Sequence, residues 1–328
     1  MKTEHVIVET SDEVSTIKFA EPDKLNLLRV ETIKELEDCL EEAVRHNPHV
    51  IIITGGNGKV FSAGADIKEM RQMNRYQALE YAKIGQRIIE RIERAPIIVI
   101  AAIDGICVGG GMELIQACDF RIATRRSVFG QPEINIGIST GWGASQRLPR
   151  IVGLSKAKEL ILTGKRITAE EALKIGFLYR VVPPEKLNET VNELTSELKK
   201  KSRATLAAAK LTLNLTTQLP LKYGLQTETL LWSALFETHD QKEGMTAFLE
   251  HRDPNFKDSN EEYLKAIILQ PNPAYSDYIT DFLQRKHEQF VNTILNNYFE
   301  MYRKNINFTF TVFETLVNAY IQNLKGER

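Results

Sequence analysis

The sequence predicts an α/β layered fold. Short unbroken apolar runs at Val50–Thr54 and Ile97–Ile103 are typical of strands that are covered on both faces. Helical patterns lie between such runs, and this alternation of strand and helix indicates an α/β arrangement. From Ser155 onward the pattern is mostly helical. We therefore expect a core that contains a parallel sheet, followed by a helical region.

The elements can be justified in chain order. The alternating segments His5–Glu9 and Val14–Phe19 predict two strands around a polar turn. A helix is predicted over Val30–Asn47, because apolar residues recur there at helical spacing and Pro48 ends the pattern. The remaining predictions are helices over about Asp66–Arg94, Met112–Ala117, Lys156–Thr163, Ala169–Ile175, Lys186–Lys200, Ser202–Thr217 and Leu221–Phe236, and a strand over Asp119–Ala123.

The composition changes near the C-terminus. Residues 261–328 hold six Phe and six Tyr but only one glycine, Gly326, and Pro271-Asn272-Pro273 has the composition of a boundary. Beyond it, aromatic and aliphatic residues recur at helical spacing in two stretches, which predicts two helices in a hairpin.

Charge and cysteine content exclude several classes of protein. The chain has 328 residues, 42 basic and 43 acidic, so its net charge of −1 argues against nucleic acid binding over a broad surface. Three scattered cysteines are too few for a disulfide framework. We see no N-terminal targeting signal, and the longest apolar run, residues 95–103, is far too short for a membrane span. We expect a cytoplasmic protein without a membrane or nucleic acid partner.

Three segments stand out as candidates for chemistry: Phe61–Lys68, Gly109–Glu113 and Phe129–Glu133. Each of the first two is expected to join a strand to a helix. The first N–H groups of a helix lack partners, and glycines let a ligand approach them, so two facing turns would form a pair of donors for an oxyanion.

Glu113 and Glu133 follow glycine-rich or strand-ending turns. If the two carboxylates converge, mutual repulsion raises one pKa, and the pair can act as acid and base on one water. Simpler interpretations stay open at this point: tight packing for the glycine triplet, a helix-dipole partner for Glu113, a solvated loop acid for Glu133, and a helix N-cap for Asp66.

Other motifs are absent. Gly58-Lys59 is followed by Val60, so there is no P-loop, and the glycine triplet does not extend to a dinucleotide fingerprint. The six histidines show no metal-ligand spacing, so we expect no metal and no separate cofactor.

Taken together and in order, the segments resemble the enoyl-CoA hydratase/isomerase (crotonase) family from about residue 4 to about residue 259. The matching motifs are Lys24-Leu25-Asn26, Ala63-Gly64-Ala65-Asp66, Ala101–Gly105, Gly109–Glu113, Cys118-Asp119, Phe129–Glu133, Gln146-Arg147-Leu148, Leu162-Thr163-Gly164 and Asn255–Asp258. The loop Ile138–Trp142 departs from the family, because it lacks a common proline and carries the bulky Trp142.

Residues 260–328 have no counterpart in the family pattern, and we expect them to form an additional aromatic-rich helical extension. The resemblance implies a spiral of ββα units over 1–200 and a helical region for trimerisation over 201–259. It implies a homotrimer or homohexamer that binds acyl-CoA thioesters. Carried over by position, Glu113 and Glu133 are the catalytic pair, the N–H groups of Ala65 and Gly110 form the oxyanion hole, and the Gly141 N–H helps to hold the water. The CoA contacts fall on Lys24, Leu25, Ala63, Asp66, Ile67 and Lys68.

The implied reaction is reversible syn addition of water to a trans-2-enoyl-CoA in fatty acid metabolism, as in β-oxidation, because many relatives with other chemistries lack one glutamate. The alternatives are an isomerase or another acyl-CoA enzyme of the same fold, and a non-catalytic scaffold whose residues 260–328 bind a protein partner. The sequence leaves open the acyl-chain length, the direction of the reaction in the cell, and the role of that extension.

Overall fold

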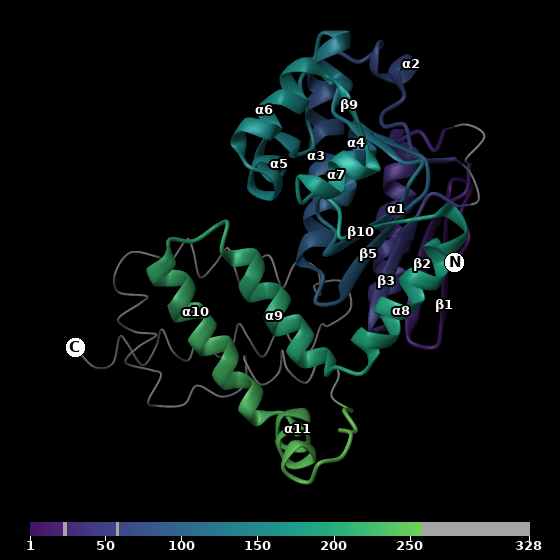
Figure 1. Ribbon diagram of the computed structural model, residues 1–328. Helices are drawn as coiled ribbons and strands as arrows, with labels where there is room; N and C mark the ends of the chain where they lie inside the picture. The colour runs from purple at the N-terminus through teal and green to yellow at the C-terminus, as the bar shows by residue number, and fades with distance from the viewer. Residues whose placement is uncertain (22–24, 57–58, 258–328) are drawn as a thin grey trace, which may run out of the picture. The chain divides into compact units, whose positions relative to one another are not determined.

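A computed structural model describes residues 1–21, 25–56 and 59–257 of the chain (Figure 1). The chain divides into two units, Met1–Asn260 and Glu261–Arg328, and all of the described residues belong to the first. The hairpin predicted within residues 261–328 therefore lies outside the described residues.

Two sheets form the core of this unit. The larger sheet has the strand order β1-β2-β3-β5-β7-β10, and the smaller has the order β4-β6-β8-β9. The strands are β1 Val6–Ser11, β2 Val14–Phe19, β3 Val50–Thr54, β4 Val60–Ser62, β5 Ile98–Ile103, β6 Ile106–Val108, β7 Phe120–Thr124, β8 Val128–Gly130, β9 Arg166–Thr168 and β10 Arg180–Val182.

Consecutive strands alternate between the two sheets. β3, β5 and β7 enter the larger sheet, and β4, β6 and β8 follow each of them into the smaller one. The pairs β3–β5, β5–β7, β4–β6 and β6–β8 are all parallel. This repetition is the spiral of ββα units that the resemblance implied, and it brings the ends of β4, β6 and β8 to one side of the small sheet.

The helices are mostly those that the periodicity predicted. They are α1 Val30–Arg45, α2 Ile67–Met70, α3 Arg75–Arg94, α4 Gly110–Ile115, α5 Ala144–Val152, α6 Leu154–Thr163, α7 Ala169–Lys174, α8 Leu187–Lys199, α9 Arg203–Leu215, α10 Leu221–Ala234 and α11 His239–Leu249, with 3-10 turns η2 Pro132–Ile136, η3 Pro184–Lys186 and η4 Leu235–Glu237. Among the described residues, no helix combines the length and apolar character needed to cross a membrane.

The large sheet is buried on both faces, as the unbroken apolar runs predicted. Alternate residues of β3 and β5 enter different clusters: Ile51, Ile53 and Val99 pack in the main core, whereas Ile52 and Ile100 pack against leucines of α8. Because side chains alternate along a strand, a strand with two buried faces requires apolar residues at every position.

One predicted helix is interrupted. The sequence pattern predicted a single helix over about Asp66–Arg94, but α2 ends at Met70 and α3 begins at Arg75. The cause is a capping box at Asn74, whose side chain accepts hydrogen bonds from the N–H groups of Tyr76 and Gln77 while the Gln77 side chain accepts from the Asn74 N–H. The three-residue strands and helices α5 and α11 were not predicted.

Candidate active site

The first glycine turn follows β4. Gly64 has φ +87°, and a Cβ added to it would lie 3.2 Å from the Gly110 nitrogen and 3.0 Å from the Val108 carbonyl oxygen. Only glycine allows both this backbone conformation and this approach. The turn before α2 therefore lies directly against the turn before α4.

The second turn needs glycine at each of its three positions. Gly109 has φ +56°, while a Cβ on Gly110 would lie 3.0 Å from the Trp142 ring and one on Gly111 would lie 2.8 Å from Ser62. The tight packing that we kept as the simpler interpretation is thus real. This packing also brings the first N–H of α4 to the turn that contains Gly64 and Ala65.

The N–H groups of Ala65 and Gly110 are available as donors. Gly110 is the first residue of α4, so its N–H has no partner within the helix. No hydrogen bond from either group is found within the described part of the chain. Two backbone donors of this kind can form an oxyanion hole where they face one oxygen atom.

Glu113 lies on α4, one turn after Gly110, and its side chain is buried, with 3% of the residue exposed. Its Oε1 accepts hydrogen bonds from the backbone N–H groups of Trp142 and Ala144, each at 2.9 Å. Burial raises the pKa of Glu113, and these N–H groups oppose that rise by stabilising the carboxylate. These two bonds fix the position of the carboxylate. Its second oxygen, Oε2, takes no part in them.

Glu133 lies on η2, and its Oε1 comes within 3.6 Å of the position that a Cβ on Gly109 would occupy. Burial and, to a smaller extent, the charge of Glu113 raise the pKa of Glu133 to about 7. The two carboxylates are near enough for the charge of Glu113 to act on Glu133. Burial, rather than the mutual repulsion that we expected, is the main cause of the raised pKa of each.

Two glutamines support Glu133. When the Gln131 amide is oriented to satisfy its neighbours, its nitrogen donates to Glu133 Oε1 at 2.9 Å and its oxygen accepts from Gln116 Nε2 at 3.0 Å. Both glutamines are buried. The sequence analysis did not single out either one. Gln116 lies three residues after Glu113 in an apolar segment. This spacing puts both side chains on one face of a helix, and it could have identified Gln116 as a polar residue near the site.

The residues expected to contact CoA form an exposed edge beside this turn. Leu25, Ile67 and Lys68 are exposed, and the Ala63 N–H donates to the Leu25 carbonyl oxygen at 3.0 Å. Asp66 is the N-cap of α2 and pairs with Arg29 at 3.0 Å. Its side chain therefore has the structural role of a helix N-cap, which the sequence analysis had left open. Lys24 lies outside the described residues.

Gly141 is exposed and directly precedes Trp142, whose N–H binds Glu113. Its carbonyl oxygen accepts from Gln86 Nε2 at 2.8 Å. The described residues contain no group of three or more His, Cys, Asp or Glu side chains that could hold a metal ion.

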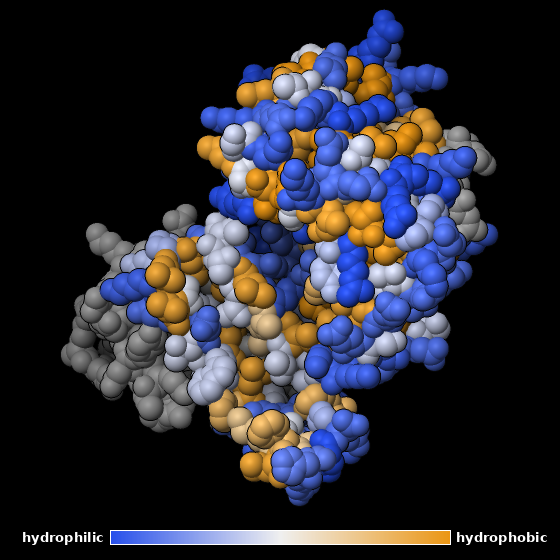
Figure 2. Space-filling view, in the orientation of Figure 1, coloured by the Kyte–Doolittle hydropathy of each residue, from blue (hydrophilic) through white to orange (hydrophobic). Residues whose placement is uncertain are grey.

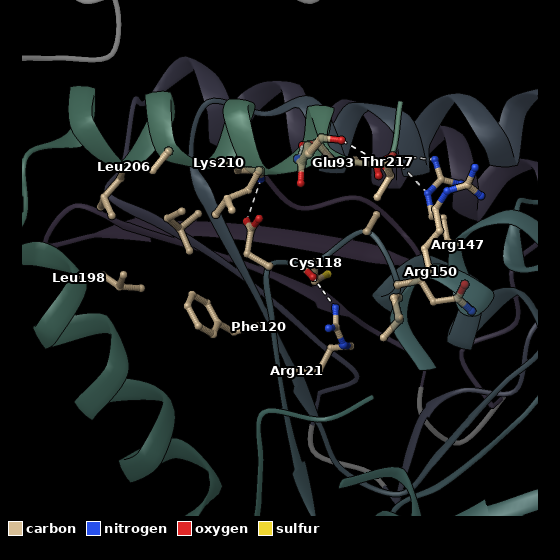
Figure 3. Close-up of a pocket in the computed structure, with 18 residues that line it drawn as sticks. Glu93, Cys118, Phe120, Arg121, Arg147, Arg150, Leu198, Leu206, Lys210 and Thr217 are labelled. Atoms are coloured by element: carbon tan, nitrogen blue, oxygen red, sulfur yellow. Dashed lines mark hydrogen bonds and ion pairs between the residues drawn. The ribbon is translucent and has the colours of Figure 1, made fainter. Parts of the chain in front are cut away.

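A cavity of about 440 Å³ lies elsewhere in the unit, between α5, α9 and the ends of β5 and β7 (Figure 3). Lys210 points toward Asp119 there, and Arg147 pairs with Glu93 at 2.8 Å. Glu113, Glu133, Ala65 and Gly110 do not line it, although Gln116 does. The cavity is therefore separate from the carboxylate pair.

Comparison with known proteins shows the family of the chain. Residues 9–260 match the family model described as enoyl-CoA hydratase/isomerase. A crotonyl-CoA hydratase from Syntrophomonas wolfei is 39% identical over 78% of this chain and 99% of its own length, and a short-chain-enoyl-CoA hydratase from Clostridium acetobutylicum is 37% identical over 77% and 97%.

A solved structure of a related protein has the same fold. The crystal structure of an enoyl-CoA hydratase from Bacillus anthracis superposes with a TM-score of 0.74 at 37% sequence identity, and the match covers 77% of this chain and 99% of that one. The chain belongs to the enoyl-CoA hydratase/isomerase family.

Proposed function

We propose that Glu113 and Glu133 are the acid–base pair with which this enoyl-CoA hydratase, a hydro-lyase, adds water to a trans-2-enoyl-CoA. One water is held between the carboxylates. Glu113 orients the water and accepts its proton while the hydroxyl bonds to C3, and Glu133 gives its proton to C2. The product is a 3-hydroxyacyl-CoA, and the proton then returns from Glu113 to Glu133.

The observation that carries this proposal is the difference between the two carboxylates. Two backbone N–H groups donate to Glu113 and oppose the rise in its pKa that burial causes. Burial and the charge of Glu113 raise the pKa of Glu133 to about 7, so that Glu133 keeps its proton in a large fraction of molecules at neutral pH. Two carboxyl groups in unlike environments can act as base and acid in the same reaction.

The substrate carbonyl is expected at the two adjacent turns. Addition of hydroxide at C3 places negative charge on the thioester oxygen, and the N–H groups of Ala65 and Gly110 would bind that oxygen. The Gly141 N–H would help to hold the water. The CoA moiety would extend along Leu25, Ala63, Asp66, Ile67 and Lys68, with Lys24 beside them.

Assembly and location complete the proposal. We propose a homotrimer or homohexamer, because helix α10 exposes large apolar side chains such as Leu221 (78% exposed) and Trp232 (59%), and apolar side chains are visible on its surface in Figure 2. A cytoplasmic location fits the three cysteines, which are unpaired and buried. Residues 260–328 remain open as a contact for a protein partner.

The test is hydration of crotonyl-CoA, followed as loss of the ultraviolet absorbance of the conjugated thioester. We expect the native chain to hydrate it and Glu113→Gln and Glu133→Gln to lower kcat/KM by about 10²–10⁴-fold, the usual contribution of a general acid or base. Glu80→Gln, which changes an exposed glutamate on α3, is the matched control and should retain full activity.

The other outcomes are distinguishable. Wild-type activity in either glutamine variant would contradict the two-carboxylate mechanism. Binding of the thioester without hydration would favour the isomerase alternative, which a 3-enoyl-CoA substrate would then test. Absence of thioester binding would favour a non-catalytic scaffold.

A further inference from the structure

Trp142 occupies a position that the reaction itself does not explain. Its backbone N–H donates to Glu113 Oε1 at 2.9 Å, so the residue is fixed to a catalytic carboxylate. Its large side chain does not extend into solvent, since only 4% of the residue is exposed. The indole therefore packs inside the protein, on a residue whose backbone contacts Glu113.

The indole lies between the oxyanion turn and helix α3. A Cβ added to Gly110 would lie 3.0 Å from its Cζ3 atom, so the ring edge contacts the residue that offers the oxyanion N–H. On the other side, a Cβ added to Gly85 of α3 would lie 2.2–2.3 Å from three indole atoms. Gly85 thus leaves the room that the ring occupies.

Two further side chains make this a continuous wall. The Tyr81 ring packs against the indole with centroids 5.3 Å apart, and the Tyr81 hydroxyl donates to the Leu28 carbonyl oxygen at 2.7 Å. Leu28 Cδ1 would lie 3.2 Å from a Cβ on Gly110, and the Leu28 N–H donates to the Gly64 carbonyl oxygen. Tyr81, Leu28 and Trp142 are all buried. We call these three residues, together with Gly85, the Trp142 wall.

We propose that the Trp142 wall closes the acyl side of the site and restricts the enzyme to short 2-enoyl groups of about four carbons. This inference rests on the proposed function, which places the thioester oxygen at Gly110 and C3 at the two glutamates. An acyl chain that continues beyond C3 from those points meets the indole, which is attached to Glu113 and packed on Gly110. A crotonyl group ends before the wall, whereas an octenoyl group has to displace it.

The test measures kcat/KM for trans-2-enoyl-CoA substrates with four, six and eight carbons. We expect the native enzyme to prefer four carbons over eight by at least about tenfold, since each methylene that a pocket must reject counts by about that factor. Trp142→Ala should raise the ratio of eight-carbon to four-carbon activity by about tenfold or more. Trp142→Phe, which keeps a smaller ring in place, should give an intermediate ratio even if the alanine variant folds poorly.

A matched control separates a specific opening from general loosening of the core. Phe177 is fully buried and packs against Phe129 away from the wall, so Phe177→Leu should leave the ratio unchanged. Equal wild-type activity on eight and four carbons, or an unchanged ratio in both Trp142 variants, would overturn this inference while leaving hydration intact. Loss of hydration at every chain length in the wild type would instead overturn the proposed function.

Discussion

In the proposed mechanism, Glu113 and Glu133 are one residue type that takes two roles from different surroundings. Both are partly or fully buried, and burial raises the pKa of each. Only Glu113 receives two backbone hydrogen bonds from the 142–144 loop, so it is the better anion of the two. Burial and, to a smaller extent, the charge of Glu113 raise the pKa of Glu133 to about 7, so we propose Glu133 as the group that keeps a proton.

The shared proton predicts the pH dependence. Hydration starts with the proton on Glu133 and ends with it on Glu113, so both directions require a pair that holds one proton. Above the Glu133 pKa of about 7 that proton is lost, and kcat/KM should fall about tenfold per pH unit. The fall should be the same for hydration and dehydration, because the overall reaction exchanges no proton with solvent.

Initial rates with crotonyl-CoA and with 3-hydroxybutyryl-CoA between pH 6 and pH 9 would check this prediction. The residual activity of Glu133→Gln should lack the limb near pH 7. A native profile that stays flat to pH 9 would show that the pair does not share a proton in this range.

Helix α3 and the loop before α5 fit together through Gly85 and Trp142. Alanine usually favours a helix interior over glycine by about 1 kcal/mol. At Gly85 the added methyl would overlap the indole, so we expect Gly85→Ala to lower the free energy of unfolding by about 1–3 kcal/mol. In a Trp142→Ala background the same change should be neutral or stabilising.

Urea denaturation of the four proteins in this double-mutant cycle would measure the coupling. Gly224→Ala on α10 is the matched control, since a Cβ there meets nothing within 4 Å and should stabilise the helix. Equal effects of Gly85→Ala in both backgrounds would show that the indole does not fill this space.

The elements differed in how far the sequence could predict them. The regular spacing of Ile33, Leu36 and Leu40 predicted α1 to within two residues, because a long amphipathic helix repeats its signal several times. Strands such as β4 and β6 have three residues, too few to show a period. The break before α3 carried a visible signal, the spacing of Asn74 and Gln77, which the apolar period of the long segment obscured.

The molecule as a whole brings together residues that no local pattern connects. Glycine turns and two glutamates were recognisable from the sequence, but their convergence depends on strands alternating between two sheets. The contacts of Gly85 with Trp142, and of Gln116 with Gln131, join segments that share no motif. Family resemblance predicted which residues to consider, whereas the packing between these distant segments required the structure.

Helix α9 is joined to the larger sheet by one buried ion pair. Lys210 Nζ lies 2.8 Å from Asp119 Oδ2 and also donates to the carbonyl oxygens of Ile92 at 3.2 Å and Ile97 at 2.9 Å. Asp119 Oδ2 in turn accepts from the Val99 N–H at 2.7 Å. The three protons of the ammonium group thus have three acceptors, all at the start of β5 or beside it.

Removing this ammonium group should weaken the attachment of the helical region to the core. Lys210→Met would leave the Asp119 carboxylate and two carbonyl oxygens without their donor, and we expect a loss of about 3–5 kcal/mol in the free energy of unfolding. Adding Asp119→Asn should recover part of that loss, because a buried amide that lacks the ammonium group costs less than a buried carboxylate that lacks it. Urea midpoints at one fixed protein concentration would measure both effects, and a midpoint for Lys210→Met equal to that of the native chain would show that this ion pair does not hold α9 to the core.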